Sequence, residues 1–142
     1  MNEPTTILVT LTGRDRPGVT SRLFADLAAH ELAVLDIEQV VIRGRLVLGV
    51  LLASEGEPDL TGIHRAVRGL AAHLDMEAEI TTGWGEPPPR RGRLHVTVLG
   101  SPLRPSAVAA IAGRIAASGA NIDRIDRRWR PPRSAVAGCQ GP

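Results

Sequence analysis

The chain has 142 residues, of which 43% are hydrophobic and 23% charged, a balance typical of a folded protein rather than a disordered one. Its formal net charge is only +2 and its aromatic content only 2%, so the composition does not favour a protein that stacks nucleic-acid bases on aromatic side chains. The chain has one cysteine, so we expect no disulfide framework. It has no apolar run near ~18 residues, so we expect no membrane partner. No signal-peptide pattern follows Met1, so we expect a cytoplasmic protein.

The first predicted elements are a strand, a loop and a helix. Apolar residues and threonines alternate over residues 5–13, which predicts a strand. A tight loop follows from Gly13 to Gly18, in which Pro17 can open a helix. Apolar side chains then recur at helical spacing, which predicts a helix over residues 19–30.

The next four predicted elements complete one domain. Residues 32–43 and 46–52 are rich in β-branched and aliphatic side chains, which predicts two strands joined by a hairpin turn at residues 43–45. The second of these strands is apolar on both faces and is therefore expected in the middle of the sheet. A helix over residues 60–74 and a strand over residues 76–83 follow. The order βαββαβ is typical of the ferredoxin-like α+β fold, an antiparallel sheet with two helices on one face.

A partial repeat follows the first domain. Residues 94–100 repeat its first strand pattern, a helical stripe comes next, and residues 119–125 resemble residues 34–40. No counterpart of the hairpin partner, the second helix or the last strand follows, so the second unit is expected to be an incomplete β-α-β unit. The predicted organisation is a complete domain at residues 1–83, a stiff Pro-rich linker at 84–92, a partial second unit at 93–130 and a disordered tail at 131–142.

The loop sequence Gly-Arg-Asp-Arg-Pro-Gly-Val at residues 13–19, inside a βαββαβ unit, resembles the ACT domain family of small modules that bind amino acids and regulate metabolic enzymes. Residues 94–100 and 119–125, after a Pro-rich linker, narrow the resemblance to the tandem-ACT regulatory half of actinobacterial-type phosphoserine phosphatases. The resemblance covers residues 5 to about 130. It implies a regulatory fragment that forms a homodimer and binds a small amino acid, with serine or glycine as the suspected ligand.

The resemblance also implies that catalysis belongs to a separate domain. Phosphatases of this family carry their nucleophile in an Asp-x-Asp-x-Thr/Val motif beside Mg²⁺. No two aspartates of this chain have that spacing, and it contains no lysine to hold a phosphate as that fold does. We therefore expect a non-catalytic chain, truncated before the catalytic domain and without a cofactor. Two alternatives stay open: a free-standing ACT regulator that acts in trans on another enzyme, and a basic nucleic-acid-binding α+β protein.

The candidate ligand site combines the loop after the first strand with a polar residue at the start of the second. Free N–H groups at a helix N-terminus favour a carboxylate, glycine lets the backbone approach a ligand, and Asp15 could pair with a ligand's ammonium group. In ACT domains an Asn or Asp at the start of the second strand often faces the ligand across a subunit interface, which indicates Asp36 and, in the repeat, Asn121. The plain alternatives are a solvated strand–helix turn and tolerant turn residues. The expected ligand-binding residues are Gly13, Asp15, Pro17, Gly18, Val19, Asp36 and Asn121.

Other side chains carry weaker signals. A basic cluster near the C-terminus consists of Arg124, Arg127, Arg128, Arg130 and Arg133 with Trp129. A solvated strand and tail fit this cluster better than a nucleic-acid contact does, because Asp123 and Asp126 dilute its charge. The four histidines are far apart in sequence, so no metal site is expected. Cys139 lies among Gly, Gln and Pro and is expected to be an inert thiol.

Overall fold

The structure is a computed structural model that describes residues 3–54, 56–84, 92, 95–100, 103–122 and 124–126. The chain divides into two compact units, residues 1–91 and residues 92–142. Within the described ranges, no helix is both long enough and apolar enough to cross a membrane.

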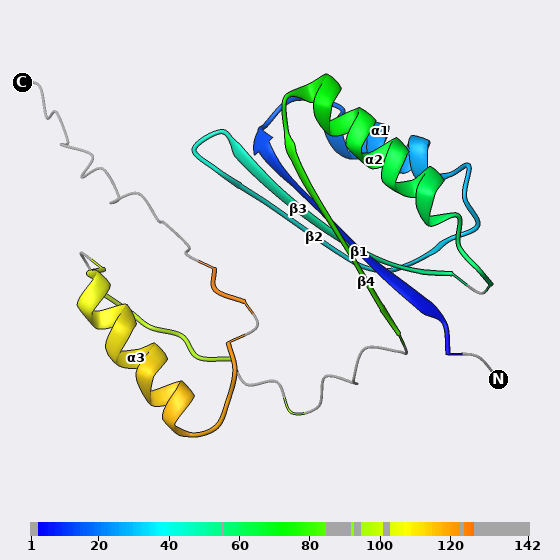
Figure 1. Cartoon of the computed structure of the whole chain (residues 1–142). Coiled ribbons are helices and arrows are strands. Elements are labelled where there is room, and N and C mark those ends of the chain that lie inside the picture. The colour runs from blue at the N-terminus through cyan, green and yellow to red at the C-terminus, as the bar shows by residue number, and fades with distance from the viewer. Residues whose placement is uncertain are drawn as a thin grey trace, which may run out of the picture. The chain divides into compact units, whose positions relative to one another are not determined.

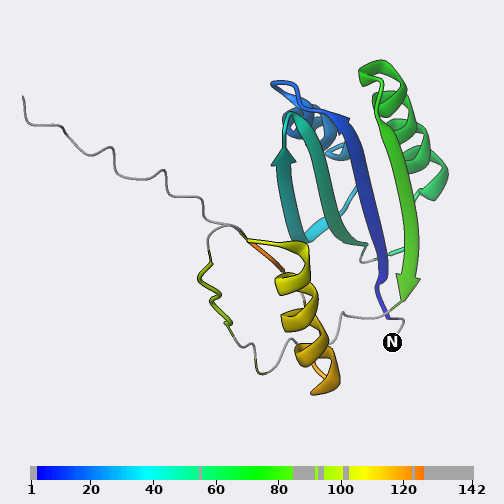
Figure 2. The ribbon, with the colours of Figure 1, turned by 90° about the vertical axis from the view of Figure 1, so that its left-hand side faces the viewer.

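The first unit consists of four strands and two helices (Figure 1). Its elements are β1 (Thr5–Arg14), α1 (Val19–Leu27), β2 (Ala33–Ile42), β3 (Arg45–Ser54), α2 (Leu60–Leu74) and β4 (Glu77–Trp84). The sheet is antiparallel throughout and has the strand order β2-β3-β1-β4. Both helices lie on one face of the sheet and leave the other face open (Figure 2). This arrangement confirms the predicted α+β ferredoxin-like fold.

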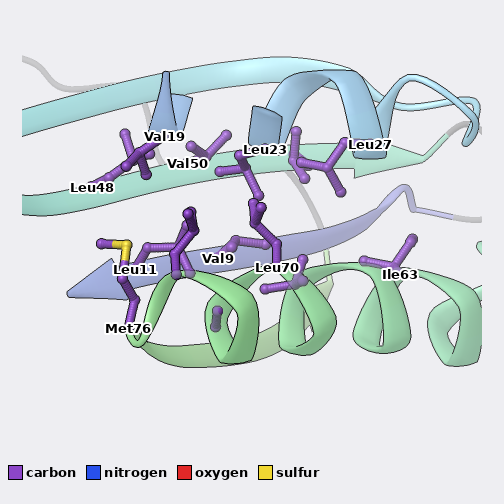
Figure 3. Close-up of a cluster of buried hydrophobic side chains, with 14 of the residues drawn as sticks. Val9, Leu11, Val19, Leu23, Leu27, Leu48, Val50, Ile63, Leu70 and Met76 are labelled. Atoms are coloured by element: carbon purple, nitrogen blue, oxygen red, sulfur yellow. The ribbon is translucent and has the colours of Figure 1, made fainter. Parts of the chain in front are cut away.

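The core lies between the sheet and the two helices (Figure 3). Because successive side chains of a strand point to opposite faces, alternate residues of β1 and β3, such as Val9, Leu48 and Val50, are fully buried against the helices. Leu23 of α1 and Ile63 of α2 close the core from the other side and are equally buried. β3 pairs with both β1 and β2, so the strand predicted to be central is central.

The two helices begin and end where local backbone geometry and packing require. Gly18 precedes α1 with a φ of 88°, which lies in the left-handed region that favours glycine. α1 ends at Leu27, earlier than the predicted His30, because the helical pattern stops there: the N–H of His30 donates to the carbonyl oxygen of Leu27 at 3.0 Å, which closes a tighter turn. α2 is capped by Asp59, whose Oδ1 accepts a hydrogen bond from the N–H of Gly62 at 2.9 Å.

A tight hairpin joins β2 to β3 at the same end of the sheet as the loop between β1 and α1 (Figure 2). Arg43 and Gly44 both have a positive φ, 48° and 76°, as in the two-residue turns that match the twist of antiparallel strands. The N–H of Asp15 donates a hydrogen bond to the carbonyl oxygen of Gly44 at 2.8 Å. This bond joins the β1–α1 loop to the hairpin.

In the described part of the second unit the predicted helix is formed, and no residue is in a strand. α3 (Pro105–Ala117) has proline in its first turn and no buried residue. Residues 95–100 and the described residues between 119 and 126 have no strand structure, which corrects the predicted β-α-β arrangement. A strand needs hydrogen-bonded neighbours, and the described residues of the second unit include no counterpart of β3 or β4, which supply them in the first unit. The predicted linker, apart from its two end residues, and the predicted tail lie outside the described residues.

Candidate functional site

The β1–α1 loop presents the exposed part of the predicted site at the hairpin end of the sheet. Asp15, Pro17 and Gly18 are all exposed. A Cβ atom added at Gly18 would meet no atom within 4 Å, so the backbone is open there. No side chain caps the first turn of α1, and uncapped N–H groups of this kind attract carboxylates. The loop therefore offers donors for an anion beside the carboxylate of Asp15.

Two of the predicted loop residues have packing roles. A Cβ atom on Gly13 would lie 2.7 Å from Cγ of Met76 and 3.2 Å from its Cα, so glycine permits β1 to approach the turn before β4 closely. The side chain of Val19 is only 2% exposed and belongs to the core. A ligand in the loop would therefore meet only the backbone atoms of Gly13 and Val19.

Asp36 lies near the start of β2, directly after an irregularity in the strand. The register between β2 and β3 shifts between Val34 and Asp36, and such a bulge changes where the neighbouring side chains point. Asp36 is half-buried, and its Oδ1 accepts a hydrogen bond from the N–H of Ile37 at 3.0 Å. Further along β2, Oγ1 of Thr20 donates a hydrogen bond to Oε1 of Gln39 at 2.7 Å. The first turn of α1 is thus tied to the middle of β2.

One chain does not bring Asp36 and the loop together. Asp36 lies opposite Leu51 of β3, whereas Gly44, which bonds to Asp15, lies at the other end of that strand beyond Arg45. Leu51 lies six positions along β3 from Arg45, which corresponds to about 20 Å. Asp36 and Asp15 are therefore far apart in one chain, although Thr20, which follows Val19, is bonded to Gln39, three residues from Asp36 along β2.

Asn121 belongs to the second unit, where it is exposed and follows α3 outside any helix or strand. Nearby, Nε of Arg124 lies 2.9 Å from Oδ2 of Asp126, with both side chains largely exposed. This ion pair offsets part of the charge of the predicted basic cluster. The remaining cluster residues and the lone cysteine lie outside the described residues: Arg127, Arg128, Trp129, Arg130, Arg133 and Cys139.

Two features of the first unit were not predicted from the sequence. Arg14 and Arg45 lie opposite each other across β1 and β3, and Arg16 and Arg43 are their near neighbours in the chain. The available signal was a pair of Arg-x-Arg triplets, each beside a predicted turn, but only the strand pairing brings them together. The second feature is β2, which with β4 is one of the two edge strands and whose apolar side chains are all exposed: Val34, Leu35, Ile37, Val40, Val41 and Ile42.

Two surface hollows of the first unit lie apart from the predicted residues. One, of about 650 Å³, runs between α1 and α2 and is lined in part by Arg22, Arg65 and His73. The other, of about 790 Å³, lies where α1 ends and α2 begins and includes His30 and Asp59. Neither hollow is lined by a predicted ligand-binding residue. Among the residues that the structure describes, no three His, Cys, Asp or Glu side chains are grouped so as to hold a metal ion.

Comparison with known families accounts for both units. The ACT domain family matches residues 5–81 and, in a second match, residues 94–129. The chain belongs to the ACT domain family. The first ACT domain match runs from the start of β1 into β4, and the second contains α3 together with the segments on either side of it.

Two phosphoserine phosphatases are similar to this ACT domain chain over most of its length. The phosphoserine phosphatase of Streptomyces coelicolor is 52% identical over 133 residues, which is 92% of this chain and 32% of that protein. Phosphoserine phosphatase SerB2 of Mycobacterium tuberculosis is 41% identical over 121 residues, 84% of this chain and 30% of that protein. The chain thus spans about a third of the length of these curated relatives. The resemblance to the ACT regulatory half of phosphoserine phosphatase is confirmed.

Solved structures share the fold of the chain. An unknown protein from Galdieria sulphuraria gives a TM-score of 0.55 at 19% identity, covering 82% of this chain and 66% of that one. Formyltetrahydrofolate deformylase from Burkholderia mallei gives a TM-score of 0.51 at 15% identity, covering 55% of this chain and 28% of that one. At these identities the likeness concerns the fold alone.

Proposed function

We propose that this chain is a regulatory ACT segment that acts in the cytoplasm and binds a small amino acid, serine or glycine. The two ACT domain matches and the phosphoserine phosphatases that match most of the chain support this role. Hydrolysis of phosphoserine yields serine, so serine or the smaller glycine is a suitable signal for control of such an enzyme. The chain senses the amino acid and does not catalyse a reaction itself.

The observation that carries the proposal is the separation of the two groups of site residues in one chain. Asp36 and the loop that contains Asp15 lie about 20 Å apart along the strands, as the strand register requires. Asp15 and the start of α1 form one part of the site and Asp36 forms the other, and neither part alone provides all the groups that the proposed ligand contacts. A second copy of the chain supplies the missing half.

The outer strand β2 provides the place where two copies join. A long, exposed, apolar edge strand is a template for pairing with another chain. When two β2 strands pair about a two-fold axis, they run antiparallel. If the axis passes near the middle of β2, Asp36 of one copy lies opposite the hairpin half of the other copy's β2, close to Gln39, which is bonded to the first turn of α1. The homodimer therefore completes a site that each chain holds only in part.

Each group in the completed site has a distinct task. The uncapped N–H groups at the start of α1 bind the carboxylate of the amino acid, and Asp15 binds its ammonium group. Asp36 from the other copy provides a second acceptor for the ammonium group or for a side-chain hydroxyl. Because the ligand contacts both copies, its binding stabilises the dimer, and this linkage is the regulatory signal.

A regulator that acts in trans on a separate enzyme is the competing assignment. The match of phosphoserine phosphatases over 92% and 84% of this chain favours a segment that controls a phosphatase. A role as a nucleic-acid-binding protein is not favoured, because the described aromatic side chains, Phe24 and Trp84, do not lie beside the exposed arginines of the loop and hairpin.

The test is isothermal titration calorimetry of the full chain with L-serine and with glycine, and with L-leucine as a bulky control ligand. Asp15→Ala and Asp36→Ala are each expected to lower the affinity for serine or glycine at least about tenfold, because each removes a charged hydrogen-bond acceptor. Asp26→Ala, on the exposed surface of α1, is the matched control and should bind as the unchanged chain does.

Mixing the two defective variants tests whether the site is shared. A dimer with one Asp15→Ala chain and one Asp36→Ala chain has one site with both aspartates intact, so an equal mixture should regain about a quarter of the sites. A mixture that forms dimers but regains no binding would show that one chain holds the whole site. Failure of the unchanged chain to bind either serine or glycine would contradict the proposed function.

A further inference from the structure

Four arginines gather at the hairpin end of the sheet. Arg14 is the last residue of β1, and Arg45 is the first residue of β3 directly opposite it. Arg43 lies in the hairpin turn, and Arg16 lies in the β1–α1 loop. All four side chains are exposed. The two chain segments that carry them lie together at one end of the sheet (Figure 2).

The backbone holds this cluster, hereafter the arginine end, in one arrangement. Partners in an antiparallel pair point to the same face and have Cβ atoms about 5 Å apart, so Arg14 and Arg45 start from neighbouring points on the open face of the sheet. The positive φ values of Arg43 and Gly44 define a tight turn. The hydrogen bond from Asp15 N–H to the Gly44 carbonyl fixes the loop beside that turn. Little ordering is therefore left for a ligand to impose on the backbone.

The arginine end lacks a matching negative charge. In the described part of the chain, none of the four guanidinium groups forms an ion pair or hydrogen bond. Asp15 lies within the loop, and Asp75 and Glu77 flank Met76, which packs against Gly13 on the β4 side of β1. Like charges directly opposite each other on a sheet are destabilising. An anion between Arg14 and Arg45 would remove that repulsion.

We propose that the arginine end binds a phosphate dianion, either free phosphate or the phosphate group of a small phosphomonoester. Guanidinium groups present their donors in a planar fork that matches phosphate oxygens, and each such charge-assisted pair is stronger than a neutral hydrogen bond. Arg14 and Arg45 start from neighbouring points and form the centre of the site, and Arg16 and Arg43 add two further positive charges from the adjoining turns. This inference does not rest on the proposed amino-acid site. That site uses Asp15, Asp36 and the start of α1, whereas the phosphate would be bound by the arginine side chains.

A nucleic acid is the competing source of phosphate, and the structure favours the small anion. Binding of single strands combines basic residues with aromatic side chains that stack the bases. Of the aromatic side chains that the structure describes, Phe24 packs against the core and Trp84 pairs with Thr5 at the opposite end of β1. The arginine end therefore supplies charge without a stacking surface.

The experiment compares sodium phosphate, glycerol 2-phosphate and sodium chloride at equal ionic strength, with the full chain. Thermal unfolding and calorimetric titration are the two measurements. We expect both phosphates to raise the melting temperature by several degrees above chloride and to give saturable binding. If chloride at equal ionic strength raises the melting temperature as much, the effect is charge screening and the proposal is wrong.

Variants locate the site. R14Q together with R45Q should weaken phosphate binding at least about tenfold, whereas R65Q together with R68Q, the same charge change on the exposed surface of α2, should leave it unchanged. The first variant should also have a higher melting temperature than the unchanged chain in low salt without phosphate, because the opposed charges are gone. Unchanged phosphate affinity in R14Q with R45Q would place binding elsewhere and overturn the proposal.

Two further measurements distinguish a small-anion site from a nucleic-acid contact and from the amino-acid site. A single-stranded oligonucleotide that binds the arginine end when neither phosphate probe does would overturn the choice of a small anion. Serine or glycine binding, measured in parallel, should persist in R14Q with R45Q. Phosphate binding without amino-acid binding would leave this inference standing while the proposed function failed, so the two can fail separately.

Discussion

At the scale of single residues, two glycines beside the β1–α1 loop are required for different physical reasons. At Gly13 the constraint is space, because a Cβ atom would collide with Met76. At Gly18 the constraint is the backbone, because its φ of 88° is unfavourable for other residues although the space around it is open. A substitution at Gly13 should therefore destabilise the fold through a steric clash, and one at Gly18 through backbone strain.

Gly13→Ala is expected to destabilise the first unit by about 1–3 kcal/mol, because the added Cβ would also lie 3.2 Å from backbone that cannot rotate away. Urea unfolding followed by circular dichroism measures the change. Gly49→Ala is the matched control: it lies in the central strand β3, has no atom within 4 Å of the new Cβ, and should be neutral or stabilising by up to about 1 kcal/mol. Equal stability of the two variants would contradict the steric argument.

Gly18→Val is expected to destabilise the fold by about 1–3 kcal/mol and to abolish serine or glycine binding, since a β-branched residue is strained at this φ and its side chain covers the open backbone. Gly18→Asn separates the two effects. Asparagine tolerates the left-handed region, so stability should largely be retained while the side chain still obstructs the ligand. Calorimetry with serine and urea unfolding of both variants provide the measurements. Normal serine binding by Gly18→Asn would show that the ligand does not contact the backbone at this position.

At the scale of elements, β2 and β3 differ in one respect that matters for assembly. Val40 and Val47 are register partners on the same face of the sheet and are 45% and 42% exposed. Val40 belongs to the outer strand, whereas Val47 belongs to a strand with a neighbour on each side. The same substitution at these two positions therefore tests whether two copies associate through the free edge of β2 or through the open face of the sheet.

Val40→Glu is expected to raise the dimer dissociation constant at least about tenfold, equivalent to about 1.4 kcal/mol, because it places a new carboxylate beside Asp36 and Glu38 of the other copy. Val47→Glu introduces the same charge at nearly the same exposure away from the edge and should leave the dimer intact. Sedimentation velocity over a range of concentrations measures both. A dimer weakened equally by both substitutions would show that the copies associate through the open face.

At the scale of the whole chain, the two units differ in whether they contain a core of their own. Every buried residue of the hydrophobic cluster lies between Ile7 and Met76, with Ala78 and Ile80 packed against it. In contrast, α3 has no buried residue, and a single helix of 13 residues is marginally stable in water. Independent stability is therefore expected only for the first unit.

A chain of residues 1–84 is expected to unfold in one cooperative transition, because it contains the complete sheet and both covering helices. Residues 92–142 alone should show weak helical signal and a gradual melt. Circular dichroism at increasing temperature distinguishes these outcomes. A gradual melt of residues 1–84 would mean that the first unit depends on the remainder of the chain.

Strand and helix patterns predicted the first unit well because each element has a buried face that the sequence repeats. The alternation through Ile7, Val9 and Leu11 and the helical stripe of α2 are local properties. The absence of strands among the described residues of the second unit depends on packing partners, which a local pattern does not contain. The opposition of Arg14 to Arg45 and the distance from Asp36 to the loop follow from register, which only the assembled sheet defines.

Thr5 pairs with Trp84, so the start of β1 and the end of β4 lie side by side at one corner of the sheet (Figure 1). Opposed residues of an antiparallel pair have Cα atoms about 5 Å apart, so a chain can enter and leave the unit almost at one point. Such a unit can be inserted into a longer polypeptide, or duplicated next to itself, without disturbing the sheet. The same proximity makes it suited to circular permutation: with Thr5 and Trp84 joined by a few glycines, new termini at the exposed Gly56 should preserve the fold.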